Sequence, residues 1–90
     1  MQEIILVSEE SHGTICVAKN YHSAISYLIK AHWLEDTTEI FHNGKEITVA
    51  TVLGENQLDK IFSWSVMEFN NFFDGLFTLV FDSVYDDLTE

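Results

Sequence analysis

The sequence predicts an α+β fold, in which a small antiparallel or mixed sheet of three or four strands packs against two or more helices. Apolar, largely β-branched runs at 3–8 and 14–19, with an alternating aromatic run near the C-terminus, predict the sheet. Apolar residues at helical spacing after the good capping residues Asn20 and Ser65 predict the helices. The length suits one small core, so we expect a single domain over residues 1–90.

The N-terminal third predicts a β-hairpin followed by a helix. Residues 3–8 (EIILVS) form a buried strand, Gly13 allows a tight turn, and residues 14–19 (TICVAK) form the antiparallel partner strand. Asn20 then caps a helix over 21–34. Its apolar residues have helical spacing and are Tyr21, Ala24, Ile25 and Leu28, with Trp33 or Leu34 closing the segment.

The middle of the chain predicts a second hairpin and a less regular segment. Residues 37–48 (TTEIFHNGKEIT) hold an Asn43–Gly44 turn between two short strands, which could add a fourth strand to the sheet. Residues 46–64 leave two alternatives open, a continued strand or two short helices separated at Gly54. We favour helices because Thr48 can cap the first. The second has apolar residues at helical spacing, namely Leu58, Ile61 and Phe62.

The C-terminal third predicts a capped helix followed by a strand. Ser65 and Glu68 form a capping box that opens a helix over 66–74, and Gly75 is placed to end it. One stripe of this helix is apolar and consists of Val66, Phe69, Phe72 and Phe73. A strand follows at 76–85, with one face formed by Phe77, Leu79 and Phe81. We expect these aromatic residues in the core and the carboxylates outside it, because burying an unpaired charge is costly.

The charge of the chain is strongly and unevenly acidic. Fifteen acidic residues face four lysines and no arginine, which gives a net charge of −11. Residues 1–45 carry −3, residues 46–90 carry −8, and no basic residue follows Lys60. A field of one sign repels nucleic acid and anionic membranes and attracts cationic surfaces.

The sequence has no pattern typical of a catalytic or metal site, so we expect a non-enzyme with no cofactor and no bound metal. Residues 82–87 (DSVYDD) lack the glycine and the spacing of a calcium-binding EF-hand loop. Cys16, the single cysteine, lies in an apolar run and predicts a buried, inert thiol without a disulfide partner. The histidines fall in turns or on different helix faces, without the spacing of zinc ligands: His12, His22, His32 and His42.

The acidic residues of the C-terminal third form the predicted partner-binding surface. They come from a helix, its end, the following strand and the tail, and are Glu68, Asp74, Asp82, Asp86, Asp87 and Glu90. A DNA duplex shows about one negative charge per 1.7 Å of its axis, and a folded surface with rows of carboxylates can resemble it. We therefore predict an inhibitor that occupies the cationic surface of a nucleic-acid-binding protein and does not itself bind nucleic acid. A solvated face that only keeps the protein in solution is the alternative reading of the same charges.

A resemblance supports this hypothesis. The phrase MEFNNFFDGLFTL at 67–79, followed by the acidic VYDD at 84–87, resembles phrases in small acidic proteins of phages and prophages of Gram-positive bacteria. Some proteins of this class are anti-CRISPR proteins, which block RNA-guided nucleases, often by occupying the DNA-binding cleft. The resemblance implies such a nuclease as the partner and the host-cell cytoplasm as the location. It carries over no functional residue.

An alternative function is a structural or assembly protein, such as a homodimer that associates through an exposed sheet edge or aromatic patch. In that case the acidity serves only solubility. The N-terminal residues lack the basic start of a signal peptide, and no apolar run reaches the length of a transmembrane helix. We therefore expect a cytoplasmic protein.

Overall fold

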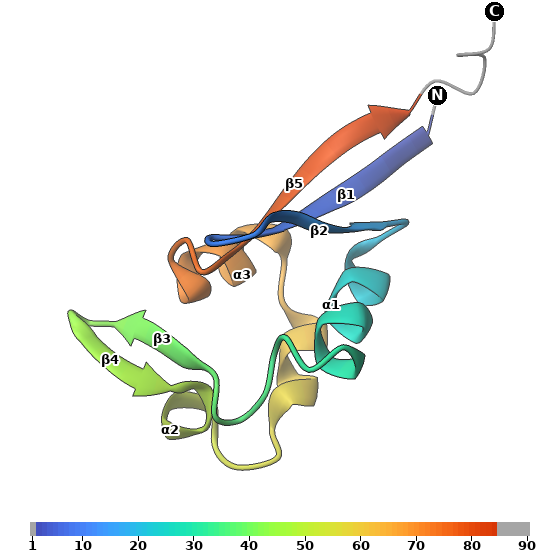
Figure 1. The fold of residues 1–90 in the computed structure, drawn as a ribbon. Helices are drawn as coiled ribbons and strands as arrows, with labels where there is room; N and C mark the ends of the chain where they lie inside the picture. The colour runs from blue at the N-terminus through green and yellow to red at the C-terminus, as the bar shows by residue number, and fades with distance from the viewer. Residues whose placement is uncertain (1, 85–90) are drawn as a thin grey trace, which may run out of the picture.

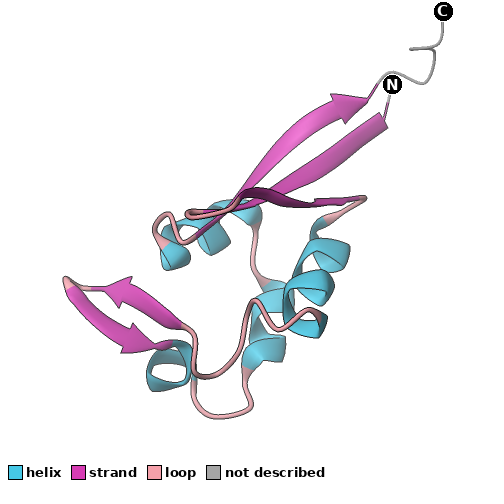
Figure 2. Ribbon diagram, viewed as in Figure 1, coloured by secondary structure: helices cyan, strands magenta, loops and turns pink. Residues whose placement is uncertain are grey.

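The computed structural model describes residues 2–84 and shows an α+β arrangement of two small sheets and several helices (Figures 1 and 2). In chain order the elements are β1 (Gln2–Glu9), β2 (Gly13–Ala18), α1 (Tyr21–Lys30), β3 (Glu39–His42), β4 (Lys45–Thr48), α2 (Val49–Leu53), the 3₁₀-helix η1 (Leu58–Ser63), α3 (Val66–Phe73) and β5 (Phe77–Val84). The predicted fold class is confirmed.

The main sheet has three antiparallel strands in the order β2-β1-β5. β1 pairs with β5 over its whole length but with β2 only from Ile5 to Glu9. The outer parts of β1 and β5 therefore extend past β2 as a two-stranded ribbon, at the end where the chain termini lie (Figure 1). β3 and β4 form a separate two-stranded sheet, so the second hairpin does not add a fourth strand to the main one.

One face of the main sheet packs on the helices and forms the core. Ile5, Val7, Phe77 and Leu79 alternate along β1 and β5, and each is at most 2% exposed. α1 and α3 lie against this side of the sheet (Figure 2). Phe81 belongs to the same face, yet it is 54% exposed. The prediction that Phe81 is a core residue is wrong, because the helices cover only the first part of β5.

α1 is shorter than predicted because the chain turns at His32. This residue has the left-handed backbone conformation, with φ of 64°. The N–H of His32 donates to the carbonyl of Ile29 at 3.1 Å, and the N–H of Trp33 donates to the carbonyl of Leu28 at 2.9 Å. This is a Schellman motif, in which histidine takes the position usually held by glycine. The turn sends the chain back over the helix end, so that Leu34 is fully buried.

The segment between β4 and α3 folds as two short helices, the alternative that we favoured. The hydroxyl of Thr48 accepts a hydrogen bond from the N–H of Thr51 at 3.3 Å and so caps α2. Gly54, with φ of 102°, ends α2. The second helix, η1, has 3₁₀ rather than α geometry. It is tied to α1 because the Tyr21 hydroxyl donates to the carbonyl of Ile61 at 2.7 Å.

α3 begins with the predicted capping box. The Ser65 hydroxyl accepts from the N–H of Glu68 at 3.1 Å, and the Glu68 carboxylate accepts from the N–H of Ser65 at 2.9 Å. The helix ends at Asp74, whose φ is 46°. Phe69 and Phe73 are buried, as predicted. The other members of the predicted stripe, Val66 and Phe72, are partly buried and pack against the core.

Among the residues that the structure describes, no helix is long and apolar enough to cross a membrane.

Candidate functional site

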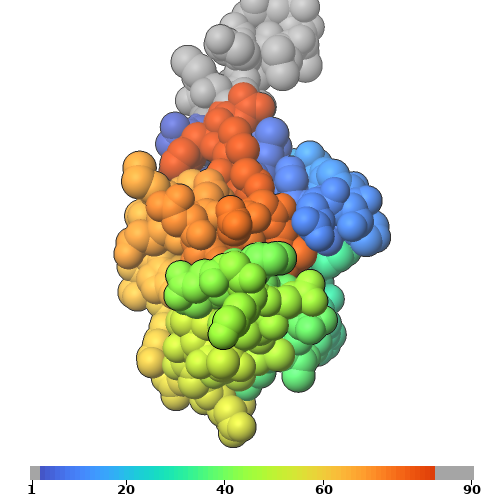
Figure 3. All heavy atoms as spheres, turned by 90° about the vertical axis from the view of Figure 1, so that its left-hand side faces the viewer, coloured from blue at the N-terminus to red at the C-terminus, as the bar shows by residue number. Residues whose placement is uncertain are grey.

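An acidic groove lies between the β3–β4 hairpin and the junction of α3 with β5. Figure 3 shows this face of the molecule, where the hairpin (green) adjoins the α3–β5 region (orange). The groove has a volume of about 190 Å³. Its lining consists of four carboxylate residues and four apolar ones: Glu10, Glu39, Glu46 and Asp74, with Ile40, Phe41, Phe73 and Leu76.

The hairpin forms one wall of the acidic groove. Glu39 and Phe41 are alternate residues of β3 and therefore lie on the same face, whereas Ile40 points into the core and is 2% exposed. Glu46 of β4 is paired directly with Phe41. Phe41 is 56% exposed, so an aromatic ring stands in the solvent beside two carboxylates.

The other wall comes from two turns that are distant in the sequence. Glu10 follows β1, and its N–H donates to the carbonyl of Leu76 at 3.1 Å. This bond fixes the β1–β2 turn beside the start of β5. Asp74 is the left-handed residue that ends α3, and its side chain is exposed. Backbone hydrogen bonds thus fix both turns, and with them the positions from which the two carboxylates extend.

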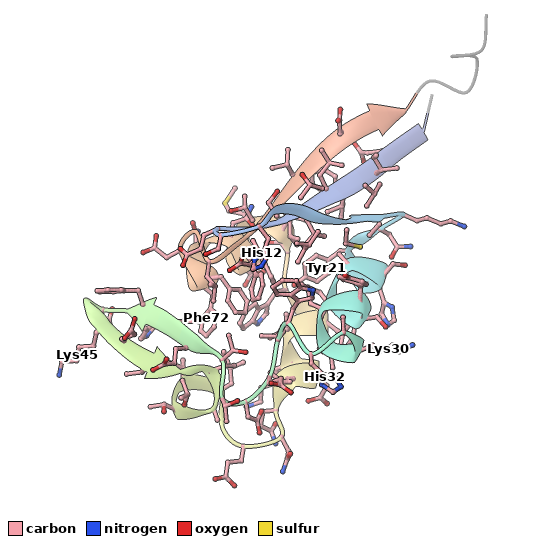
Figure 4. The ribbon with its side chains drawn as sticks, viewed as in Figure 1. His12, Tyr21, Lys30, His32, Lys45 and Phe72 are labelled. Atoms are coloured by element: carbon pink, nitrogen blue, oxygen red, sulfur yellow. The ribbon has the colours of Figure 1, made fainter. Side chains whose placement is uncertain are left out.

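This arrangement suits a cationic ligand group of a partner. An ionised carboxylate has no proton to donate and can only accept hydrogen bonds, so it pairs well with the N–H groups of a lysine or arginine. An exposed aromatic face adds a cation–π contact for a lysine or arginine. No lysine lines the groove. Lys45, at the tip of the hairpin, points away from the rest of the molecule (Figure 4).

Of the six acidic residues predicted to bind a partner, Asp74 lines the acidic groove. Glu68 is exposed on the first turn of α3, where its carboxylate closes the capping box. Asp82 is exposed on β5, opposite Ile4 and roughly 17 Å along the strand from Phe77. Neither Glu68 nor Asp82 lines the groove. The remaining three, Asp86, Asp87 and Glu90, lie outside the described residues.

Sequence reasoning missed Glu39 and Glu46 as members of the site. It named Glu10 only as part of an alternative acidic surface, with Glu9, Glu35 and Asp36. A two-residue turn at Asn43–Gly44 fixes the hairpin register, so the sequence could have placed Phe41 beside Glu46. It holds no comparable signal for Glu10, which reaches the groove only through the packing of the main sheet against the hairpin.

The histidines do not converge. His12 packs edge-on against Trp33 with ring centroids 5.1 Å apart, and His22 packs on Phe62 at 4.6 Å. His42 lies 6.0 Å from Phe72. Within residues 2–84, no three histidine, cysteine, aspartate or glutamate side chains lie close enough together to hold a metal ion. That the protein binds no metal and is not an enzyme stays a prediction.

Two ionisable groups have a raised pKa because they are partly buried. Burial raises the pKa of the Cys16 thiol, which disfavours the reactive thiolate at neutral pH. Burial also raises the pKa of Tyr21 above its usual range, and the nearby charge of Glu68 adds to this effect. The Tyr21 hydroxyl donates a hydrogen bond to the carbonyl of Ile61, and burial disfavours the ionised form of both groups, so neither has the features of a nucleophile.

No model of a known protein family, no curated protein and no solved structure matches the chain.

Proposed function

We propose that the protein inhibits a nucleic-acid-binding protein by occupying its cationic surface, as a mimic of nucleic acid, in the cytoplasm of the cell that it acts in. The observation that carries the proposal is the acidic groove, which four carboxylate residues from three separate chain segments line together with the exposed ring of Phe41. An RNA-guided nuclease, the partner that the sequence resemblance implies, is the first partner to test.

The charge of the whole molecule supports the same function. The described part carries twelve acidic residues and all four lysines, a net charge of −8 out of the −11 of the full chain. Such a field speeds encounter with a cationic partner over about a Debye length, roughly 8–10 Å at physiological salt. The same field opposes direct binding to DNA or RNA.

Besides the overall negative field, the groove provides a binding place for individual cationic side chains. A lysine or arginine that reaches into it meets carboxylates from both walls and can lie against Phe41. A nucleic-acid-binding protein presents such side chains in a row, because it has to neutralise consecutive phosphates.

A second candidate function is assembly of two copies of the chain through the uncovered face of the main sheet. Val17 is 60% exposed and Val80 is 49% exposed, and both are paired with Leu6 of the central strand. These three residues form an apolar row on the face away from the helices. Salt separates the two functions, because added salt weakens an electrostatic complex but not an apolar dimer.

The test compares two variants that remove the same charge. Glu39→Gln/Glu46→Gln removes two carboxylates of the groove, and Glu3→Gln/Glu55→Gln removes two exposed carboxylates that do not line it. Displacement of a labelled DNA duplex from a guide-loaded Cas9-type nuclease is followed by fluorescence anisotropy. The groove variant should displace DNA about tenfold less well or worse than wild type, and the control should stay within about twofold.

Failure of wild type to displace DNA from any of a panel of such nucleases would refute the proposed function. Equal displacement by wild type and the groove variant would show that the acidic groove is not the binding surface. In that event Asp82→Asn/Asp86→Asn/Asp87→Asn tests the strand and tail residues that the sequence predicted.

A further inference from the structure

A second and larger cavity lies between the end of α1, the loop that follows it, and η1. This basin has a volume of about 670 Å³ and is open to solvent. Its floor is apolar and is formed by Ile29 and Leu34 at the end of α1 and by Leu58 and Phe62 of η1. None of the residues that line this basin lines the acidic groove.

The basin is held open by hydrogen bonds between segments that are distant in the sequence. The Schellman turn at His32 places Leu34 at its base, and Figure 4 shows His32 at that end of α1. The Asp36 carboxylate accepts from the N–H of Asn56 at 2.9 Å, and the Asp36 carbonyl accepts from the N–H of Ala50 at 3.0 Å. These bonds fix the loop after α1 against α2 and the start of η1, so the cavity does not need a partner to form it.

Six polar residues line the basin and form its rim, and three of them are acidic: Glu35, Asp36 and Asp59, with His32, Thr37 and Asn56. Nδ1 of His32 lies 3.2 Å from the Glu35 carboxylate, and no lysine lines the basin. Lys60, which follows Asp59, instead donates to the carbonyl of Leu53 at 3.2 Å. The rim therefore favours an apolar group with positive charge beside it.

We infer that the basin docks a basic amphipathic helix of a partner protein. Its volume of about 670 Å³ exceeds what one side chain fills, so the basin has room for several neighbouring apolar side chains. Sites for small molecules place polar groups where they orient the ligand. Here the floor is apolar and the polar groups lie around it, which matches a helix that inserts apolar residues spaced i, i+3 and i+4 and keeps lysines or arginines at its flanks.

This inference is independent of the proposed function. It concerns a different cavity, different carboxylates and a different kind of contact, because burial of apolar side chains supplies the binding and the rim supplies only orientation and selectivity. The experiment uses the groove variant Glu39→Gln/Glu46→Gln as one of its arms, so that the two proposals fail separately.

The probe is a synthetic peptide of leucine and lysine at helical spacing, about 18 residues or five turns long. Its control has the same composition with strict leucine–lysine alternation, which is amphipathic only as a strand. The peptide is titrated into the full chain, and the amide chemical shifts in ¹H–¹⁵N spectra give both its affinity and the residues that it contacts. We expect the helical peptide to shift resonances of residues 29–37 and 56–62, and the control peptide to bind much more weakly.

Two basin variants test the site. Leu58→Gln alters the floor and should weaken binding about tenfold or more. Glu35→Gln/Asp59→Asn changes two exposed carboxylates of the rim and leaves the bonds of Asp36 in place. Glutamine keeps a side-chain oxygen for the contact of Glu35 with Nδ1 of His32, and the variant should weaken binding roughly threefold to tenfold. The groove variant removes the same number of charges and should bind the peptide nearly as well as wild type.

Three results would overturn the inference. They are no binding of the helical peptide up to about 1 mM, equal binding of wild type and the rim variant, and loss of binding in the groove variant with shifts confined to the acidic groove. The last result would assign the peptide to the groove and leave the proposed function standing. Far-UV circular dichroism and thermal melts show whether Leu58→Gln folds, and the rim variant decides the matter if it does not.

Discussion

The side chain of Asn70 makes two hydrogen bonds with the backbone of Leu79 at the open edge of the main sheet. Its amide NH₂ donates to the carbonyl of Leu79 at 2.9 Å, and its amide oxygen accepts from the N–H of Leu79 at 2.8 Å. β5 is an edge strand, so the backbone groups of Leu79 that point away from β1 have no strand to pair with. The side-chain amide has the same donor and acceptor as a peptide group, and it substitutes for the missing strand at this residue.

Replacing Asn70 with alanine should therefore destabilise the protein by about 1–3 kcal/mol, because two backbone groups of a partly buried strand lose their partners. The matched control is Asn71→Ala, which changes an exposed asparagine of the same helix. Urea unfolding of the three proteins measures the difference. Equal midpoints for Asn70→Ala and Asn71→Ala would show that water replaces the amide without cost.

Glu9 organises the β1–β2 turn through its charge. Its carboxylate accepts from the N–H of Ser11 at 2.8 Å and lies 2.7 Å from Nδ1 of His12. The hydrogen bond with His12, followed by that from Ser11, lowers the pKa of Glu9 below its ordinary value of 4.5. A lowered pKa in the folded state means that ionised Glu9 stabilises the fold above about pH 4.5 and that this contribution disappears as the pH falls through the folded-state value.

The variant Glu9→Gln tests this linkage. Glutamine keeps an oxygen for the N–H of Ser11 but has no charge, so wild type should be the more stable protein near pH 6. The difference in unfolding free energy should shrink as the pH falls below about 4.5 and through the lower folded-state pKa of Glu9. Chemical unfolding at a series of pH values measures it. A difference that stays constant across this range would contradict the role of the charge.

At the scale of the element, α3 combines a local start signal with an aromatic core face. The capping box fixes where the helix begins, and its buried residues then meet the main sheet. Phe69 and Phe73 stack with ring centroids 4.4 Å apart, and Phe73 contacts Phe77 of β5 edge-on at 5.4 Å. Phe72 lies to the side, against Trp64 at 4.9 Å, and stays partly exposed.

Alanine substitutions along this helix should therefore differ in cost. Phe69→Ala empties a fully buried position and should destabilise by about 3–5 kcal/mol, which approaches the whole stability of a small domain. Phe72→Ala loses a half-buried ring and should cost roughly 1–2 kcal/mol, less than the sequence alone predicts for a member of the stripe. Thermal melts monitored by circular dichroism rank the two. The reverse order would mean that Phe72 and not Phe69 faces the core.

At the scale of the whole molecule, the dominant feature is repulsion between like charges. The chain of 90 residues carries a net charge of −11, and repulsion between carboxylates opposes compaction. Part of this repulsion arises in the acidic groove, since its four carboxylate residues line a single depression. The positive charge of a partner would reduce the repulsion.

Moderate salt should consequently stabilise the isolated protein. Raising sodium chloride from about 0.01 M to 0.15 M shortens the Debye length from roughly 30 Å to 8 Å, and the midpoint of thermal unfolding should rise by a few degrees. Chloride is preferred to sulfate because sulfate also strengthens apolar burial. A midpoint that falls with salt would show that attractive pairs outweigh the repulsion.

The sequence alone determined where the α-helices of this protein begin. Caps at Asn20, Thr48 and Ser65 lie where residue type and spacing predict them, because a capping side chain reaches only two or three residues along its own chain. The Asn43–Gly44 turn likewise follows from the dipeptide itself. The alternation along β5 also predicted which side of the strand Phe77 and Leu79 take.

Only the tertiary structure decided what these elements cover and bring together. Phe81 has the pattern of a core residue, but the helices end before it, and no local signal records how far a helix extends over a sheet. Asn70 has the propensity of an ordinary helix-surface residue, and its role appears only beside Leu79. Glu10 and Asp74 meet Glu46 in the acidic groove because apolar burial, which is not directional, brings the hairpin against the end of α3. The composition predicted an acidic surface, and the packing of the elements determined which carboxylates lie together in the groove.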